Sequence, residues 1–438
     1  MKKAAECLDF FHNVMREIKC DRYVAQYNVI PSINLSRVKA KKTDIISINT
    51  YLGHPSKMME KGSVIRQNSS LSETGSEFFW KAASCRLAGY PLFVTEYNHC
   101  YWNQYEYEGG IFFPAYSALQ GFSGITIHSA PIVIEKKAMT SFEVGTSPTK
   151  RANEFLAMSL FRRGDVQSSP HRVELLFPDD FFRDGNAGAG SVNSNHAMLA
   201  FLTGIALRFP EVAIGGTEKP DLSLLPAVSA KINSEAWFSS VENSASGNLV
   251  DCIAKLRSAK ILSPTNSTDA GKQIFISDTG QLMLDMARKR LKVITPETEV
   301  VTLKPNDIGI ELRRMTVHSV DANCAAAVTT LDDLPLSESR HMMFVLNTAS
   351  GSEGLVLSGD RTTLVEWKDD TAPQMETVRI DVSLKITGKN WKLYPLSLSG
   401  KRRDPLPVAV QGDSLRFRID TASLSAGTTP FFELVKEE

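Results

Sequence analysis

Glu96 is the residue of this 438-residue chain whose surroundings most clearly indicate chemistry. It ends the short apolar run 91–95, and Tyr97, Asn98 and His99 follow directly. At the carboxyl end of a strand in a (β/α)8 barrel, a lone Glu is a candidate nucleophile or general acid/base. The structural alternative is a strand-end Glu paired with a nearby Lys or Arg. The polar and aromatic residues nearby favour the catalytic interpretation.

Several other side chains could act beside Glu96. Tyr51 ends a second β-rich run, and its hydroxyl could hydrogen-bond Glu96 and keep it ionised. Amide, imidazole and indole groups could bind a ligand rich in hydroxyl groups, and we expect Asn28, His99 and Trp102 to line the same face as Glu96. These candidates are Asn28, Asn49, His54, Asn98, His99, Trp102, Asn103 and His128. A structural role competes for each, because strand-end His residues often only pack and loop aromatics often cover a core.

A second catalytic carboxylate is harder to find. The other acidic residues of this region are Glu73, Glu77, Glu106, Glu108 and Glu143. None follows a strand-like run that ends in Asn-Glu, so we interpret them as solvated helix or loop charges. The chain has no P-loop, HExxH or GxSxG motif, and its six cysteines are scattered without paired spacing. We therefore expect reduced core thiols, no metal and no cofactor.

Composition narrows the class of partner. The 49 Lys and Arg residues balance the 49 Asp and Glu residues, and no basic run stands out, which disfavours a nucleic-acid binder. A neutral polar substrate fits better. The charged residues Glu6, Asp9 and Arg16 interrupt the apolar run that a signal peptide would need after Met1, and no apolar segment is long enough to span a membrane.

Strands and helices alternate over the first third of the chain. An amphipathic helix opens it, and strands are expected near 22–28, 44–50, 91–96 and 124–128, with helices between them. This order predicts parallel β/α units, and four of them make half of a (β/α)8 barrel. We assign this half-barrel to residues 1–145.

The remaining chain divides into two regions of different character. Residues 146–271 predict an α/β connecting domain, and residues 272–438 predict an antiparallel β-sandwich, because short strands recur there between Gly, Asp, Asn and Pro turns. The connecting domain should contain helices at 153–163 and 196–209, a strand at 171–178 and a loop at 184–195.

Motifs along the chain resemble one enzyme family. The relevant segments are 44–51 with His54-Pro55, 68–71, 94–99, 102–105 and 114–122, followed by 160–166, 277–282 and 294–298. The first five resemble the second half of the catalytic barrel in the clan A retaining glycoside hydrolases, especially the large cellulase- and agarase-like bacterial enzymes. The last three are similar to accessory-domain motifs of the same enzymes.

The resemblance implies a role for each strand end. Glu96 would end the seventh barrel strand as the nucleophile, while the acid/base, a Glu that ends the fourth strand, would precede Met1. We therefore expect poor hydrolysis of ordinary glycosides by this chain. His128 departs from the family pattern, in which many members carry a Trp. The resemblance also implies a secreted or periplasmic full-length form.

Three interpretations stay open from the sequence. The chain is a retaining glycoside hydrolase that lacks its first barrel half, or a carbohydrate-binding pseudoenzyme without an acid/base. Alternatively, it is a structural fragment whose half-barrel closes only against another polypeptide or a second copy, because an open parallel sheet leaves unpaired edges and uncovered apolar surface.

Overall fold

The structure is a computed structural model, and it describes most of the chain. The described residues are 2–25, 28, 31–129, 139–177, 192–212, 219–225, 248–368, 371–386 and 388–437. The fold is mixed α/β, with parallel sheets in the first half and antiparallel sheets in the second. No helix in these ranges is both long and apolar enough to cross a membrane.

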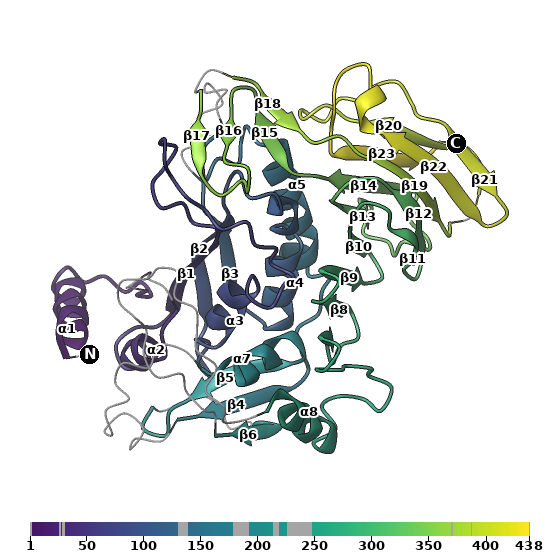
Figure 1. The fold of residues 1–438 in the computed structure, drawn as a ribbon. Coiled ribbons are helices and arrows are strands. Elements are labelled where there is room, and N and C mark those ends of the chain that lie inside the picture. Colours follow the sequence, from purple (N-terminus) through teal and green to yellow (C-terminus); the bar gives the residue numbers. More distant parts are fainter. Residues whose placement is uncertain are drawn as a thin grey trace.

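A three-stranded parallel sheet organises the first part of the chain (Figure 1). Its strands lie in the order β1, β2, β3, and each follows a helix. The elements are α1 (Lys2–Glu17), α2 (Ile33–Ala40), β1 (Ile46–Leu52), α3 (Glu77–Ala83), β2 (Leu92–His99), the 3-10 turn η1 (Glu106–Glu108), α4 (Phe112–Leu119) and β3 (Gly124–Ile127). Three of the four predicted strands are therefore present.

The strand expected at 22–28 is wrong for the residues that are described there. Residues 22–25 and 28 form no strand, and residues 26 and 27 lie outside the described ranges. Val24 bonds to the chain before β1: its carbonyl accepts from the N–H groups of Asp44 and Ile45. The neighbouring Tyr23 is 84% exposed, so this aromatic side chain packs against no core.

Helices α3 and α4 cover one face of this sheet with aromatic side chains. Tyr97 of β2 stacks on Phe113 of α4 with ring centroids 4.4 Å apart. Phe78 of α3 stacks on the same Phe113. The opposite face, which we call the open face, carries side chains outside this apolar core. They are Asn49, Tyr51, Thr95, Glu96 and Asn98.

A second parallel sheet, in the order β5, β4, β6, forms the middle region. Its elements are α5 (Pro148–Ala157), the π-helical turn η2 (Met158–Arg163), β4 (Arg172–Leu176), α7 (Ser194–Ala197), η4 (Met198–Phe201), β5 (Gly204–Arg208), β6 (Leu222–Leu224) and α8 (Leu249–Ser258). The predicted helix at 196–209 is correct only in its first half. A short apolar run is ambiguous between helix and strand, and the run after Gly204 pairs with β4 instead. Most of the predicted loop at 184–195 lies outside the described residues.

Two antiparallel sheets form the C-terminal region, as the sequence predicts. The larger has eight strands in the order β20, β23, β14, β13, β10, β9, β8, β7, and the smaller has five in the order β11, β12, β19, β22, β21. Phe344 of β14 packs edge-on against Phe417 of β22, so the sheets share one apolar core, an arrangement typical of β-sandwiches.

The strand bounds of this region follow chain order. They are β7 (Ile274–Ile276), β8 (Leu282–Asp285), β9 (Arg290–Ile294), β10 (Thr298–Leu303), β11 (Ile308–Glu311), β12 (Met315–Val320), β13 (Cys324–Thr330), β14 (His341–Asn347), β15 (Ser350–Ser352), β16 (Val356–Leu357), β17 (Leu364–Glu366), β18 (Pro373–Met375), β19 (Arg379–Leu384), β20 (Trp391–Pro395), β21 (Val408–Gln411), β22 (Ser414–Asp420), and β23 (Phe431–Lys436). One 3-10 turn, η5 (Thr421–Ser423), interrupts them.

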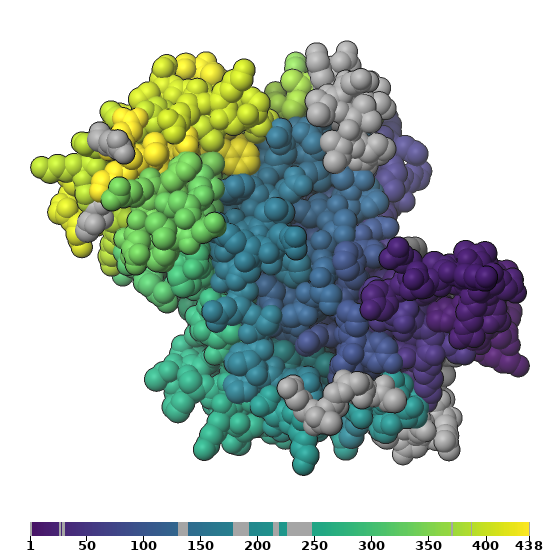
Figure 2. Space-filling model, turned by 180° about the vertical axis from the view of Figure 1, so that it is seen from behind, coloured from purple at the N-terminus to yellow at the C-terminus, as the bar shows by residue number. Residues whose placement is uncertain are grey.

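The three regions pack closely on one another. One apolar cluster runs from Ile33 to Leu396 and includes residues of both parallel sheets and of the eight-stranded sheet. The short strands β15 to β18 lie beyond the carboxyl ends of β1 and β2 (Figure 1). Helix α1, by contrast, projects from one side of the molecule (Figure 2). The predicted boundaries after residues 145 and 271 stay predictions.

Candidate functional site

A β-bulge sets the direction of Glu96. Ile48 of β1 pairs with Val94 of β2, but the next residue, Asn49, pairs with Glu96. Thr95 is therefore skipped in the pairing with β1. The pairing of β2 with β3 is irregular at the same point. Bulges of this kind redirect side chains and are common beside active sites. Here, Thr95 and Glu96 both leave the apolar core, and Tyr97 returns to it.

The carboxylate of Glu96 has two polar neighbours at the carboxyl ends of the parallel strands. The Tyr51 hydroxyl at the end of β1 donates a hydrogen bond to Glu96 Oε2. His128, directly after β3, places Nδ1 3.6 Å from the same oxygen. The Glu96 side chain stays about one-third exposed, at 34%. Partial burial, followed by the contact with Glu96, raises the pKa of Tyr51, so this phenol stays a hydrogen-bond donor.

Phe142 holds this group of side chains together. Its ring contacts the rings of Tyr51, His54 and His128, with centroids 4.9 to 5.5 Å apart. The loop that carries Phe142 is anchored at the preceding residue, because the buried ammonium of Lys150 donates to the Ser141 carbonyl at 3.0 Å. Phe142 is not among the site residues predicted from the sequence. It stands in a loop without periodicity, so no local signal marks it.

Three predicted ligand-binding residues lie close to Glu96 and already have protein partners. Asn49 Oδ1 accepts a 2.6 Å hydrogen bond from the Thr95 hydroxyl. Asn98 donates to the His128 carbonyl at 2.7 Å and so ties β2 to the end of β3. The His54 Nδ1 atom lies 2.8 Å from the Pro55 carbonyl, and its ring packs edge-on against Tyr51. In these contacts the three residues bond to other parts of the protein around Glu96.

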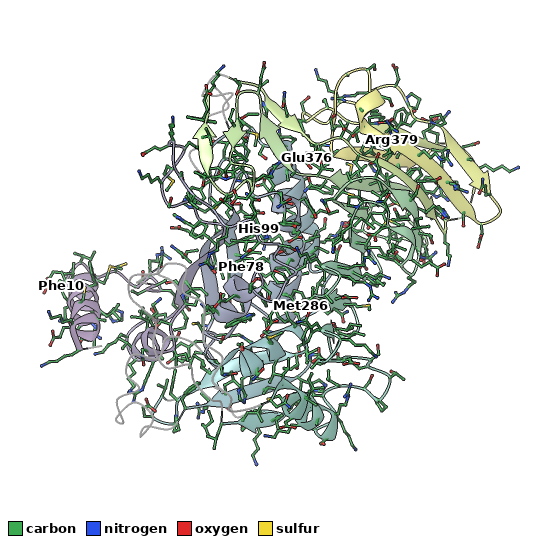
Figure 3. All side chains as sticks on the ribbon, in the orientation of Figure 1. Phe10, Phe78, His99, Met286, Glu376 and Arg379 are labelled. Carbon is green, nitrogen blue, oxygen red and sulfur yellow. The ribbon has the colours of Figure 1, made fainter. Side chains whose placement is uncertain are left out.

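His99 does not share a face with Glu96, contrary to expectation. It lies three positions farther along β2, on the helix side, where its ring contacts Phe78 (Figure 3). It is 1% exposed, and neither ring nitrogen has a hydrogen-bond partner among the described residues. Burial, with a smaller effect of Lys150, lowers the pKa of His99 to about 3. A neutral, enclosed imidazole of this kind is part of the core.

Trp102 and Asn103 also do not line the open face. Trp102 is 1% exposed within a small apolar cluster that includes Tyr101 and Leu364 of β17, so residues from the C-terminal region cover it. Asn103 is equally buried. Its amide nitrogen donates to the carbonyls of Arg66 and Asn68, and its oxygen accepts from Tyr105 N–H. The polar atoms of Asn103 therefore fix loop conformation.

Asn28 is exposed, and no described contact places it beside Glu96. Its neighbours on both sides, residues 26, 27, 29 and 30, lie outside the described ranges. The prediction that Asn28 lines the same face as Glu96 is therefore not supported by any contact.

The other acidic residues of this region have partners elsewhere. Glu77 pairs with Lys81, and Glu73 accepts from Gln273. Glu106, Glu108 and Glu143 are buried, so the interpretation of these three as solvated charges is wrong. Glu106 accepts a hydrogen bond from Ser350 N–H, and Glu108 accepts from Ser69 and Ser70. Glu143 accepts from Gly145 N–H. None of these described contacts involves Glu96.

The described ranges contain no cluster of metal-ligating side chains. No group of three or more His, Cys, Asp or Glu residues is arranged there to hold a metal ion. The six cysteines are free thiols, of which Cys85, Cys100, Cys252 and Cys324 are buried, as expected of core thiols. Cys7 and Cys20 are only partly buried, so the expectation of core thiols does not hold for them.

Comparison with known proteins gives the chain no family. No family profile matches the sequence, and no curated protein matches it either.

Proposed function

We propose that this chain carries the nucleophile side of a retaining glycoside hydrolase site, with Glu96 as the attacking carboxylate. The sheet of β1, β2 and β3 would then correspond to strands of the second half of a (β/α)8 barrel, and the open face to the barrel interior. One observation carries the proposal: Tyr51 at the end of β1 donates to Glu96 at the end of the parallel strand β2.

Chemical logic assigns the roles in this pair. A carboxylate attacks an anomeric carbon through one of its two oxygens. Contacts to the other oxygen must therefore hold the carboxylate in a fixed orientation. Tyr51 and His128 both approach Oε2, which leaves Oε1 without either of these neighbours. Tyr51 is therefore a positioning residue, and Oε1 of Glu96 is the attacking atom.

A slow-releasing substrate tests the proposal directly. Incubation with a panel of 2,4-dinitrophenyl 2-deoxy-2-fluoroglycosides should form an ester between Glu96 and the anomeric carbon as dinitrophenolate departs. This leaving group needs no protonation, so the test does not depend on an acid/base. Intact-mass and peptide mass spectrometry should find the added fluorosugar on the peptide that contains Glu96.

Two variants make the labelling experiment decisive. Glu96→Gln should take up no label, because the amide is a poor nucleophile, whereas Glu60→Gln, at an exposed position, should label like the wild type. Labelling at another carboxylate, or no labelling by any sugar of the panel, would refute the assignment of Glu96.

A carbohydrate-binding protein without turnover is the second candidate. The observation that favours it is that the described polar neighbours of Glu96, Tyr51 and His128, include no carboxylate that could serve as the acid/base. In that case Glu96→Gln should bind oligosaccharides as well as the wild type does in calorimetry, and neither protein should form the covalent adduct.

A further inference from the structure

Helix α1 exposes an unusual amount of apolar surface. Of its residues, only Leu8 is buried. Phe10, Phe11 and Ile18, which directly follows the helix, are 63%, 44% and 66% exposed. Figure 3 labels Phe10 on α1 at the edge of the molecule, away from both sheets of the first half. Exposed aromatic and aliphatic side chains that lie side by side mark an interaction surface.

Apolar residues along α1 and directly after it repeat with a heptad spacing, and of these Phe11 and Ile18 are exposed while Ala4, Cys7 and Val14 are partly exposed. One row contains Ala4, Phe11 and Ile18, at intervals of seven, and the adjacent row contains Cys7 and Val14. The N–H of Ile18 donates to the Val14 carbonyl, so helical geometry extends to Ile18. Two such rows three to four residues apart form the seam by which one helix packs against another in a coiled coil. Leu8 lies outside this seam, so α1 can contact the body and a partner at once.

The charges beside the seam are self-complementary. Lys3 and Glu17 are exposed, and they lie seven residues before and seven residues after Phe10. At 1.5 Å per residue, each is about 10 Å from Phe10 along the helix axis. If a second α1 packs antiparallel with the two-fold axis near Phe10, Lys3 of each copy meets Glu17 of the other. A parallel pair would keep these charges at opposite ends.

We propose that α1 is the contact surface of a homodimer in which two copies pack their α1 helices antiparallel through this seam. The proposal is independent of the catalytic role of Glu96. The ion pair between Lys42 and Asp9 anchors α1 to the chain before β1 on the other side of the helix. One helix pair buries far less than a standard interface, so the dimer should dissociate on dilution.

Sedimentation velocity of the full chain over a range of micromolar concentrations tests the proposal. The wild type should shift from monomer to dimer as concentration rises. Phe11→Ser, in the middle of the seam, should stay monomeric throughout. Val410→Ser, which removes a similarly exposed side chain from β21, should dimerise like the wild type. Thermal unfolding of all three proteins checks that each is folded.

A charge swap tests the antiparallel orientation. Lys3→Glu should weaken the dimer roughly tenfold, because it removes two ion pairs and creates two like-charge contacts. Adding Glu17→Lys to that variant should restore wild-type dimerisation, since both pairs re-form with reversed sign.

Three results would overturn the proposal. The first is a wild-type monomer at every concentration. The second is a dimer that Phe11→Ser leaves intact. The third is a monomer that binds anionic lipid vesicles through Phe11, because α1 would then serve as a membrane-surface helix.

Discussion

Asn49 of β1 pairs with Glu96 of β2, and the hydroxyl of Thr95, the residue that the pairing skips, donates to the Asn49 side chain at 2.6 Å. The same hydroxyl lies 3.2 Å from the Ile48 carbonyl. Thr95 therefore fastens the bulge to the neighbouring strand at the point where the ladder changes register. Since the bulge sets the direction of Glu96, Thr95 is expected to affect the Glu96 carboxylate, although its described hydrogen bonds go to β1.

Thr95→Val should loosen this bulge. The substitution keeps the shape of the side chain but removes the hydroxyl, which leaves the half-buried Asn49 oxygen without this donor. We expect the free energy of unfolding to fall by about 1 kcal/mol in urea titrations, and labelling of Glu96 to slow. Thr95→Ser, which retains the hydroxyl, should label at nearly the wild-type rate. Equal labelling by Val and Ser variants would show that the bulge holds without Thr95.

Tyr51→Phe should slow labelling of Glu96 without unfolding the protein. The ring still packs against Phe142 and His54, but the hydrogen bond to the carboxylate is lost. A hydrogen bond to a charged group is worth about 1.5–3 kcal/mol, so the rate constant of labelling should drop roughly tenfold to a hundredfold. Tyr23→Phe, at a position 84% exposed, serves as the control. An unchanged rate in Tyr51→Phe would remove this residue from the mechanism.

Local patterns in the sequence predicted the strands that carry the site better than they predicted the residues that pack around it. The carboxyl ends of parallel strands meet at one edge, so the contact between Tyr51 and Glu96 could be expected from their strand ends. The position of His99 was also predictable in principle, because side chains three positions apart on a strand point to opposite faces. The expectation that His99 shares a face with Glu96 overlooked this alternation.

The surroundings of Trp102 and Phe142 could not be predicted in the same way. Trp102 is buried by residues such as Leu364, which lie far along the chain and reach it only through the packing of the C-terminal region. Phe142 reaches Tyr51 from an irregular loop. Neither contact leaves a periodic signal in the sequence. The strand expected at 22–28 failed for a related reason, because β-rich composition does not supply a partner strand or a core.

Glu108 should make the protein less stable as pH rises. Burial raises the pKa of Glu108 from 4.5 to about 7, although hydrogen bonds from Ser70 and Ser69 act against it. The folded protein thus binds this proton more tightly than the unfolded chain does. The resulting stabilisation is full below the unfolded pKa and is lost as pH rises through the folded pKa.

Glu108→Gln isolates this contribution. The neutral amide resembles the protonated acid but does not titrate, so the stability advantage of the wild type over the variant should shrink between about pH 5 and about pH 8, by up to the order of 3 kcal/mol. Urea unfolding at both pH values measures it. Glu60→Gln, an exposed change, should follow the wild type at both. A constant difference between wild type and Glu108→Gln would mean that Glu108 is ionised throughout.

Arg163 and Arg162 are adjacent in sequence but should differ sharply in their importance for stability. The Arg163 guanidinium binds both oxygens of the buried Asp165 at 2.7 and 2.6 Å. It also donates to the Thr330 carbonyl and the Thr329 hydroxyl, which joins η2 to β13 of the eight-stranded sheet. Lysine cannot reproduce this forked geometry. Arg163→Lys should therefore lower the free energy of unfolding by about 2 kcal/mol.

Arg162→Lys provides the matched control for this change. Arg162 is exposed, so the same replacement there should alter stability by no more than about 0.5 kcal/mol. Urea unfolding followed by circular dichroism should also show whether the transition of Arg163→Lys splits into two, because the lost contacts join the middle region to the antiparallel sheets. If both variants unfold at the wild-type midpoint, packing of the shared apolar core alone holds these regions together, and the Arg163 contacts add nothing measurable.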